Sequence, residues 1–136
     1  MRSCAVRSLL LLLTLPCVAP ALAQEWTRFR GPNGTGVSDA KSIPVTWTES
    51  DYRWTTRLPG KGHGSPVVWG ERLFVLSADP DSATRYVICV HTGTGDILWQ
   101  RDYAAAKHAL NSLNSYATST PAVDEQRVYV AWASGD

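Results

Sequence analysis

The chain has 136 residues, with 13 Lys and Arg against 12 Asp and Glu and a formal net charge of +1. Charged residues make up 18% and aromatic residues 10% of the chain, with six Trp, a composition typical of folded and not of disordered proteins. The charges are balanced and no basic cluster stands out, so an electrostatic surface for nucleic acid is excluded and no nucleic-acid partner is expected.

Residues 1–23 have the order of an export signal. Arg2 and Arg7 precede the apolar run Leu9–Leu13, and Ala21–Ala23 supplies a small-x-small cleavage site. We therefore predict a signal peptide over 1–23 and an exported protein, periplasmic or extracellular, with a peripheral position at the outer membrane as one option. The length that remains fits one domain.

Two alternative interpretations of residues 1–23 fit the sequence less well. Pro16 and Pro20 interrupt it, which leaves too short an apolar run for a membrane-spanning helix, so no transmembrane segment is expected after cleavage. Cys17 would be the attachment site of a lipid anchor, but the residues before it are a poor match to the small residues that lipoprotein processing requires. Cleavage would also remove Cys4 and leave Cys89 as the one cysteine. Since Cys89 lies in an apolar run, we predict a buried packing residue and not a reactive thiol.

Short β-rich runs begin at residue 45, after an N-terminal extension over 24–44, and long helical periodicity is absent. Runs of β-branched and aromatic residues joined by Gly, Pro, Asp and Thr are typical of antiparallel strands and turns. The predicted strands, in chain order, are 66–69, 72–76, 84–91 and 96–101, joined at 70–71, 78–83 and 92–95. They predict a four-stranded meander.

Two internal matches indicate a repeated unit. Residues 65–75 align without a gap with 120–130, 55 positions later, and Asp51–Trp54 aligns with Asp96–Trp99, 45 positions later. The predicted order is a last strand near 51–58, a full blade at 65–103 and the start of the next blade at 120–132. The two offsets place an insertion between 104 and 119. A partial β-propeller over 45–136 explains this order, whereas a β-sandwich leaves the early Trp-bearing copy unexplained.

The segment Cys89–Trp99 resembles the blade signature of quinoprotein-like (PQQ-repeat) β-propellers. Thr94, Gly95 and Trp99 fall on that signature, while Cys89 and His91 stand where Ala and Asp are usual. The segments 26–34, 58–66 and 111–121 look like exported bacterial members, including relatives of the propeller subunit of the outer-membrane barrel-assembly machinery.

The resemblance implies an all-β fold, a β-propeller of four-stranded antiparallel blades, about seven or eight when complete. About one and a half blades are present, so we expect an N-terminal fragment. In this reading the Gly turns the chain with φ above zero, and each Trp docks against the neighbouring blade. Removing such a buried Trp99 would cost about 3 to 5 kcal/mol. The structural signature residues are Thr94, Gly95, Trp99 and Trp54.

Two functions follow from the resemblance. One is a non-enzymatic exported module that binds protein or cell-envelope partners. The other is the N-terminal part of a quinoprotein dehydrogenase that uses PQQ with calcium. The signature residues are turn and packing residues, no Cys-Cys pair occurs, and no Glu, Asn and Asp set can be assigned to calcium. The first function is therefore favoured, with no catalytic, cofactor-binding or metal-ligating residue predicted.

Three further sequence features favour structural roles over binding or modification. The spacing of His63, His91 and His108 does not suit zinc, and His91 is read as a strand-end residue. The Gly-rich segment 60–64 lacks a phosphate-loop motif and reads as a flexible connector. Asn33-Gly34-Thr35 fits a glycosylation acceptor but is favoured as a turn.

The insertion 104–119 is the predicted binding loop, because long loops on one face of a propeller carry specificity. Residues 104–110 could form a short helical turn before a polar stretch. The alternative is a capping loop whose Asn side chains only satisfy backbone groups. The residues predicted to bind a partner are Lys107, His108, Asn111, Asn114 and Tyr116.

Overall fold

The computed structural model describes residues 25–41 and 43–133, so the predicted signal over 1–23 lies outside the described residues. Its main element is a four-stranded antiparallel sheet in the order β1-β2-β3-β4, and its second is the pair β5-β6. The predicted all-β fold and the meander are confirmed. The elements are η1 (Glu49–Asp51, a single 3-10 turn), β1 (Val67–Trp69), β2 (Arg72–Ala78), β3 (Arg85–His91), β4 (Ile97–Tyr103), β5 (Ala122–Val123) and β6 (Val128–Tyr129).

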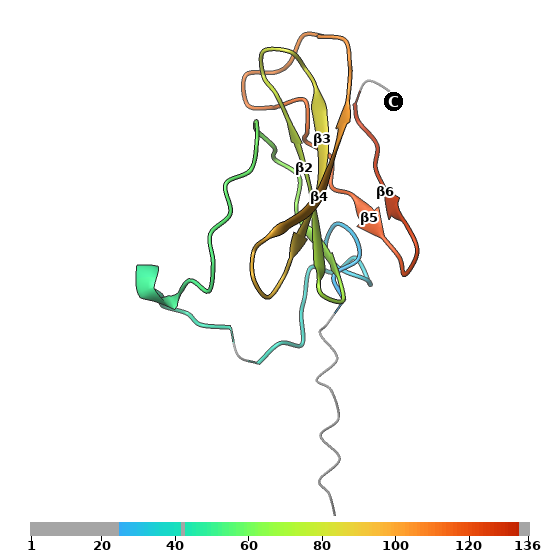
Figure 1. The fold of residues 1–136 in the computed structure, drawn as a ribbon. Coiled ribbons are helices and arrows are strands. Elements are labelled where there is room, and N and C mark those ends of the chain that lie inside the picture. The colour runs from blue at the N-terminus through green and yellow to red at the C-terminus, as the bar shows by residue number, and fades with distance from the viewer. Residues whose placement is uncertain (1–24, 42, 134–136) are drawn as a thin grey trace, which may run out of the picture.

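The two faces of the four-stranded sheet are covered by different segments. Successive side chains of a strand point to opposite faces, so Leu76 and Ser77 of β2 look opposite ways. Leu76 packs with Ala117 and Trp132 from the end of the chain, whereas the Ser77 hydroxyl donates to the Pro59 carbonyl. Figure 1 shows the resulting arrangement, with residues 50–60 (green) on one side of the sheet and the β5–β6 hairpin on the other.

The face toward the hairpin is built from cross-strand rows. Phe74 of β2, Cys89 of β3 and Trp99 of β4 share one row. The rings of Phe74 and Trp99 lean together with centroids 5.9 Å apart. Since Cys89 lies between them, a small side chain at that position lets the two aromatic residues meet. The buried residues of this region also include Val67 and Val123.

The burial of Cys89 gives a direct chemical test. Its side chain is fully buried, and burial raises the pKa of the thiol. With Cys4 and Cys17 replaced by Ser, we expect a thiol reagent to modify the folded chain at least about a hundredfold more slowly than the urea-unfolded chain, because reaction requires opening of the sheet. Similar rates in the two states would contradict this placement.

The hairpin β5–β6 repeats the pairing of β1–β2. In the first unit Val67 pairs with Phe74, and 55 residues later Ala122 pairs with Tyr129. The backbone N–H groups of Val68 and Val123, also 55 residues apart, donate to the carbonyls of Trp26 and Thr27, at 2.9 and 2.8 Å. The N-terminal segment therefore hydrogen-bonds to the first strand of both units.

The strand expected near 51–58 is not formed. Residues 49–51 make the 3-10 turn η1, and residues 52–60 hold no strand. The chain is nevertheless extended there, since Trp54, Thr56 and Leu58 are partly buried and the residues between them are exposed. A β-ladder needs a neighbouring strand, and no strand among the described residues pairs with this segment. The helical turn considered for 104–110 is also absent.

The two sheets do not close on each other. The four-stranded sheet ends at β4, and the β5–β6 pair forms a separate sheet within the described residues. The structure thus shows an antiparallel four-stranded sheet and a second antiparallel pair with the register of β1–β2.

Candidate functional site

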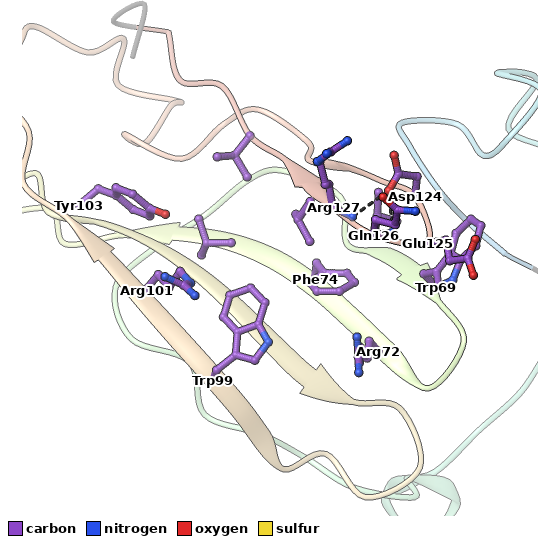
Figure 2. Close-up of a pocket in the computed structure, with 14 residues that line it drawn as sticks. Trp69, Arg72, Phe74, Trp99, Arg101, Tyr103, Asp124, Glu125, Gln126 and Arg127 are labelled. Carbon is purple, nitrogen blue, oxygen red and sulfur yellow. Dashed lines mark hydrogen bonds between the residues drawn. The ribbon is translucent and has the colours of Figure 1, made fainter.

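Two concave regions flank the buried rows. The first, which we name the hairpin cleft, lies between the four-stranded sheet and the β5–β6 hairpin and has a volume of about 310 Å³. Figure 2 shows aromatic and arginine side chains of the sheet facing polar side chains of the hairpin. The lining residues are Trp69, Arg72, Phe74, Val87, Trp99, Arg101, Tyr103, Val123, Asp124, Glu125, Gln126, Arg127, Val128 and Val130.

The open side of the hairpin cleft is aromatic and cationic. Trp99 is 37% exposed, and the guanidinium carbon of Arg101 lies 5.9 Å from the centroid of its ring. Such a cation–π contact stabilises by about 0.5 to 1 kcal/mol at an exposed position. Tyr103 is also exposed, and its ring lies 5.6 Å from that of Trp132. A large aromatic surface therefore remains in contact with water.

Asp124 is committed to the hairpin turn. Its carboxylate accepts from the Tyr129 hydroxyl at 2.7 Å and from the backbone N–H groups of Gln126 and Arg127 at 2.8 and 2.7 Å. These hydrogen bonds lower the pKa of Asp124, that from Tyr129 most strongly. The Asp124 carboxylate therefore stabilises the turn, and its hydrogen bonds go to the turn and to Tyr129 instead of to the arginine side chains of the cleft.

Trp54 docks onto the turn between β3 and β4. Its indole Nε1 donates to the Thr92 carbonyl at 2.8 Å, and its ring lies directly over Gly95. Gly95 has φ of 78°, and the Thr94 hydroxyl donates to Asp96 at 2.6 Å. Thr94 and Gly95 thus build a turn, and Trp54 fastens the preceding segment to it.

His91 supports the same turn. It is the last residue of β3, as predicted, and its Nδ1 accepts from the N–H groups of Gly93 and Thr94 at 3.1 and 3.2 Å. Its Nε2 lies 3.7 Å from a Glu71 carboxylate oxygen. His91 therefore has a structural role in the turn on which Trp54 docks.

Trp99 differs from Trp54 in its surroundings, which changes the expected effect of removing it. Because its ring is 37% exposed, the Trp99→Ala substitution should lower the free energy of unfolding by only about 1 to 2 kcal/mol, less than for a buried indole. Urea unfolding followed by circular dichroism measures this. A loss of about 3 kcal/mol or more would show that the ring is buried, as the sequence led us to expect.

The second concave region, which we name the loop pocket, has a volume of about 200 Å³. It brings together three of the five residues predicted to bind a partner: His108, Asn114 and Tyr116. The rings of His108 and Tyr116 meet edge to face at 5.0 Å, and the Tyr116 hydroxyl donates to the His108 carbonyl at 3.2 Å. The full lining is Lys61, Ala78, Pro80, His108, Leu110, Asn114, Ser115 and Tyr116.

The other two predicted residues do not line the loop pocket. Asn111 makes a turn, since its side-chain oxygen accepts from the Leu113 N–H at 3.0 Å and its carbonyl accepts from the Asn114 N–H at 2.9 Å. For Asn111 the capping interpretation therefore holds. Lys107 contributes the smallest of the effects that lower the pKa of Asp79, after the hydrogen bonds from Ser82 and Asp81.

Lys61 is a charged residue of the loop pocket that was not among the residues predicted from the sequence to bind a partner. Its backbone N–H and carbonyl both bond to Ala78 of β2, at 2.8 and 2.9 Å. A Cβ on Gly60 or Gly62 would overlap the carbonyl of Ala78 or Leu76. The glycines on either side of Lys61 thus permit close approach to β2, and the reading of this segment as a flexible connector is wrong. The Gly-Lys-Gly pattern was the available signal.

A metal ion would need a cluster of ligating side chains among the described residues. Among residues 25–41 and 43–133, no three His, Cys, Asp or Glu side chains come close enough to hold a metal ion. The residues present therefore do not fit the calcium that the quinoprotein resemblance would imply. In the same ranges no helix has the length and apolar character needed to cross a bilayer.

Comparison of the chain with protein-family models, with curated proteins and with solved structures finds no match.

Proposed function

We propose that the chain is an exported, non-enzymatic module of the quinoprotein-like β-propeller type that binds a protein or cell-envelope partner. The β1–β2 and β5–β6 pairs share one register 55 residues apart, which supports stacked repeats. The docking of Trp54 on the Gly95 turn supports a Trp that joins neighbouring units. The order of residues 1–23 supports export.

The observation that carries the binding function is the convergence of Lys61, His108, Asn114 and Tyr116 on the loop pocket. Two segments far apart in the sequence supply them. Lys61 is held by its backbone pairing with Ala78, and the other three come from the insertion that follows β4. A pocket assembled from a strand-bonded segment and a long loop is a common design for recognition.

Three polar side chains of the loop pocket have hydrogen-bonding groups that the described residues leave open to a ligand. Within the described residues, no side-chain hydrogen bond or ion pair engages the Lys61 ammonium, the His108 ring nitrogens or the Asn114 amide. The Tyr116 hydroxyl is committed to the His108 carbonyl. An ammonium and an amide fit an anionic acceptor, so the partner should present a carboxylate here.

Site-specific photocrosslinking in cells that export the protein tests this function. With a photoreactive amino acid at position 114, we expect one discrete adduct with an envelope or secreted protein. The same group at Asp39, an exposed residue of the N-terminal extension, should give none. Equal adducts at both positions, or none at either, would contradict the proposal.

A matched pair of lysine variants then measures the contribution of the loop pocket. With the crosslinked partner purified, Lys61→Gln should weaken binding about tenfold, the effect of losing one charge-assisted hydrogen bond. Lys107→Gln removes the same charge from a residue outside the pocket lining and should change binding less than about twofold. Equal effects would show that only net charge matters.

A further inference from the structure

The open edge of β6 has a counterpart that is already paired. β6 occupies in the second unit the place that β2 holds in the first, with Val128 equivalent to Leu73. The outer edge of β2 carries seven residue pairs with β3, which itself pairs with β4. Within the described residues, no strand pairs with the outer edge of β6.

Val128 of β6 points its backbone hydrogen-bonding groups toward that edge. The Val123 N–H donates to Thr27, away from β6, and the Asp124 N–H donates to the Arg127 carbonyl. In an antiparallel pair, bonded and non-bonded residue pairs alternate, so the Val123–Val128 pair is non-bonded. The N–H and carbonyl of Val128 therefore face outward, as those of Leu73 do toward Val90 of β3.

The hairpin cleft lies beside this edge, and aromatic side chains in its lining are exposed to water. Trp99 and Tyr103, which line the cleft, are 37% and 43% exposed. Buried aromatic residues of this kind dominate the energetics of protein interfaces. An extended chain bonded to β6 would lie alongside the cleft and turn alternate side chains into it.

We propose that the hairpin cleft and the β6 edge together take up an antiparallel β-hairpin with the chemistry of β3–β4. Its first strand pairs with Val128 in the register that β3 holds on β2. Its inward side chains are apolar toward Trp99, and one acidic side chain meets Arg101. Three arginines line the cleft against two acidic residues, and one of these, Asp124, is committed to its turn. This inference does not depend on the loop pocket.

The probe is a synthetic peptide of residues 84–103, the hairpin that fits the equivalent edge in the first unit. Added to the 136-residue chain labelled with ¹⁵N, it should shift the amide signals of residues 127–130 and slow hydrogen exchange at Val128 by tenfold or more. A peptide N-methylated on alternate amides of its first strand should not do so, because it cannot bond to β6.

Two variants of one residue locate the interaction on the edge. Val128→Pro removes the outward N–H at a position where an edge strand tolerates proline, and it should weaken peptide binding at least tenfold. Val128→Thr keeps the N–H and the strand preference, and it should bind as the unchanged chain does. Circular dichroism checks that both variants keep their sheet content.

Four results would overturn the proposal: no shift at millimolar peptide, equal binding by the two variants, equal binding of the methylated peptide, or shifts confined to β4. Citrate serves as a small-anion probe. If citrate produced the same shifts and excluded the peptide, the arginines of the cleft would form an anion site and the proposal would also fall.

Discussion

Gly64→Ala is expected to lower the free energy of unfolding by about 3 kcal/mol or more, which is a large share of the stability of a small domain. A Cβ at this position would overlap the backbone carbonyl of Ser119. Neighbouring bonds hold both backbones in place: His63 N–H to Ala117 carbonyl at 2.9 Å and Ser65 N–H to Thr120 hydroxyl at 2.9 Å. No side chain can rotate to relieve the overlap, so the two segments must separate.

Urea unfolding monitored by circular dichroism measures this loss. The matched control is Gly93→Ala, where the new Cβ would meet only the His91 imidazole, at 3.1 Å. A side chain can move by a few tenths of an ångström, so the control should lose less than about 1 kcal/mol. If Gly64→Ala lost no more than Gly93→Ala, the close approach of the two backbones would be wrong.

Gly95→Ala should have the second largest effect, a loss of about 2 to 3 kcal/mol. The new Cβ would lie 2.6 Å from Cδ2 of Trp54, and Gly95 already has φ of 78°. Backbone strain and displacement of the Trp54 ring therefore add together. The control Gly70→Ala shares the positive φ, at 56°, but meets nothing within 4 Å. It should cost about 1 kcal/mol from strain alone.

A double-mutant cycle separates the two contributions at Gly95. With Trp54 replaced by Ala, the ring is gone and only the Thr56 hydroxyl, 2.8 Å from the new Cβ, still obstructs it. Gly95→Ala should then cost clearly less than in the unchanged chain, with a cost closer to that of the Gly70→Ala control. The coupling between positions 54 and 95 should then amount to about 1 to 2 kcal/mol. Additive effects of the two substitutions would show that Trp54 does not dock on this turn.

The strands of the first unit could be predicted because their signals are local. Val, Ile, Phe and Tyr in short runs, broken by Gly70 and by Thr92–Gly95, set both the strands and the tight turns. The internal match at 55 residues also led to β5–β6, whose register then repeats that of β1–β2. Strand β4 runs two residues beyond the predicted end, to Tyr103.

The errors concern features that depend on distant partners. The segment at 51–58 has strand-like alternation, but a ladder also requires a neighbouring strand. Glycines 60–64 look like a connector, and only the position of β2 and Ser119 shows that they permit close backbone approach. The exposure of Trp99 likewise depends on what covers β4, which no local pattern contains.

The candidate site could be predicted only in part, because it too depends on residues that are far apart in the sequence. The insertion drew attention to His108, Asn114 and Tyr116, which do meet at the loop pocket. Lys61 comes from a segment about fifty residues earlier in the chain, so only the fold brings it there. Asn111 has the same residue type as Asn114, and its turn-forming role becomes clear only from its hydrogen bonds.

Amide hydrogen exchange tests most directly whether two repeated units pack on each other through their backbones. The Val123 N–H donates to Thr27 and the His63 N–H to Ala117, and both bonds join segments far apart in the sequence. Both amides lie outside the four-stranded sheet, so a sheet folding alone would leave them unprotected. We predict that both exchange at least about a hundredfold more slowly than unstructured amides. Unprotected exchange at Val123 and His63, with β2 and β3 protected, would contradict the packing of the two units.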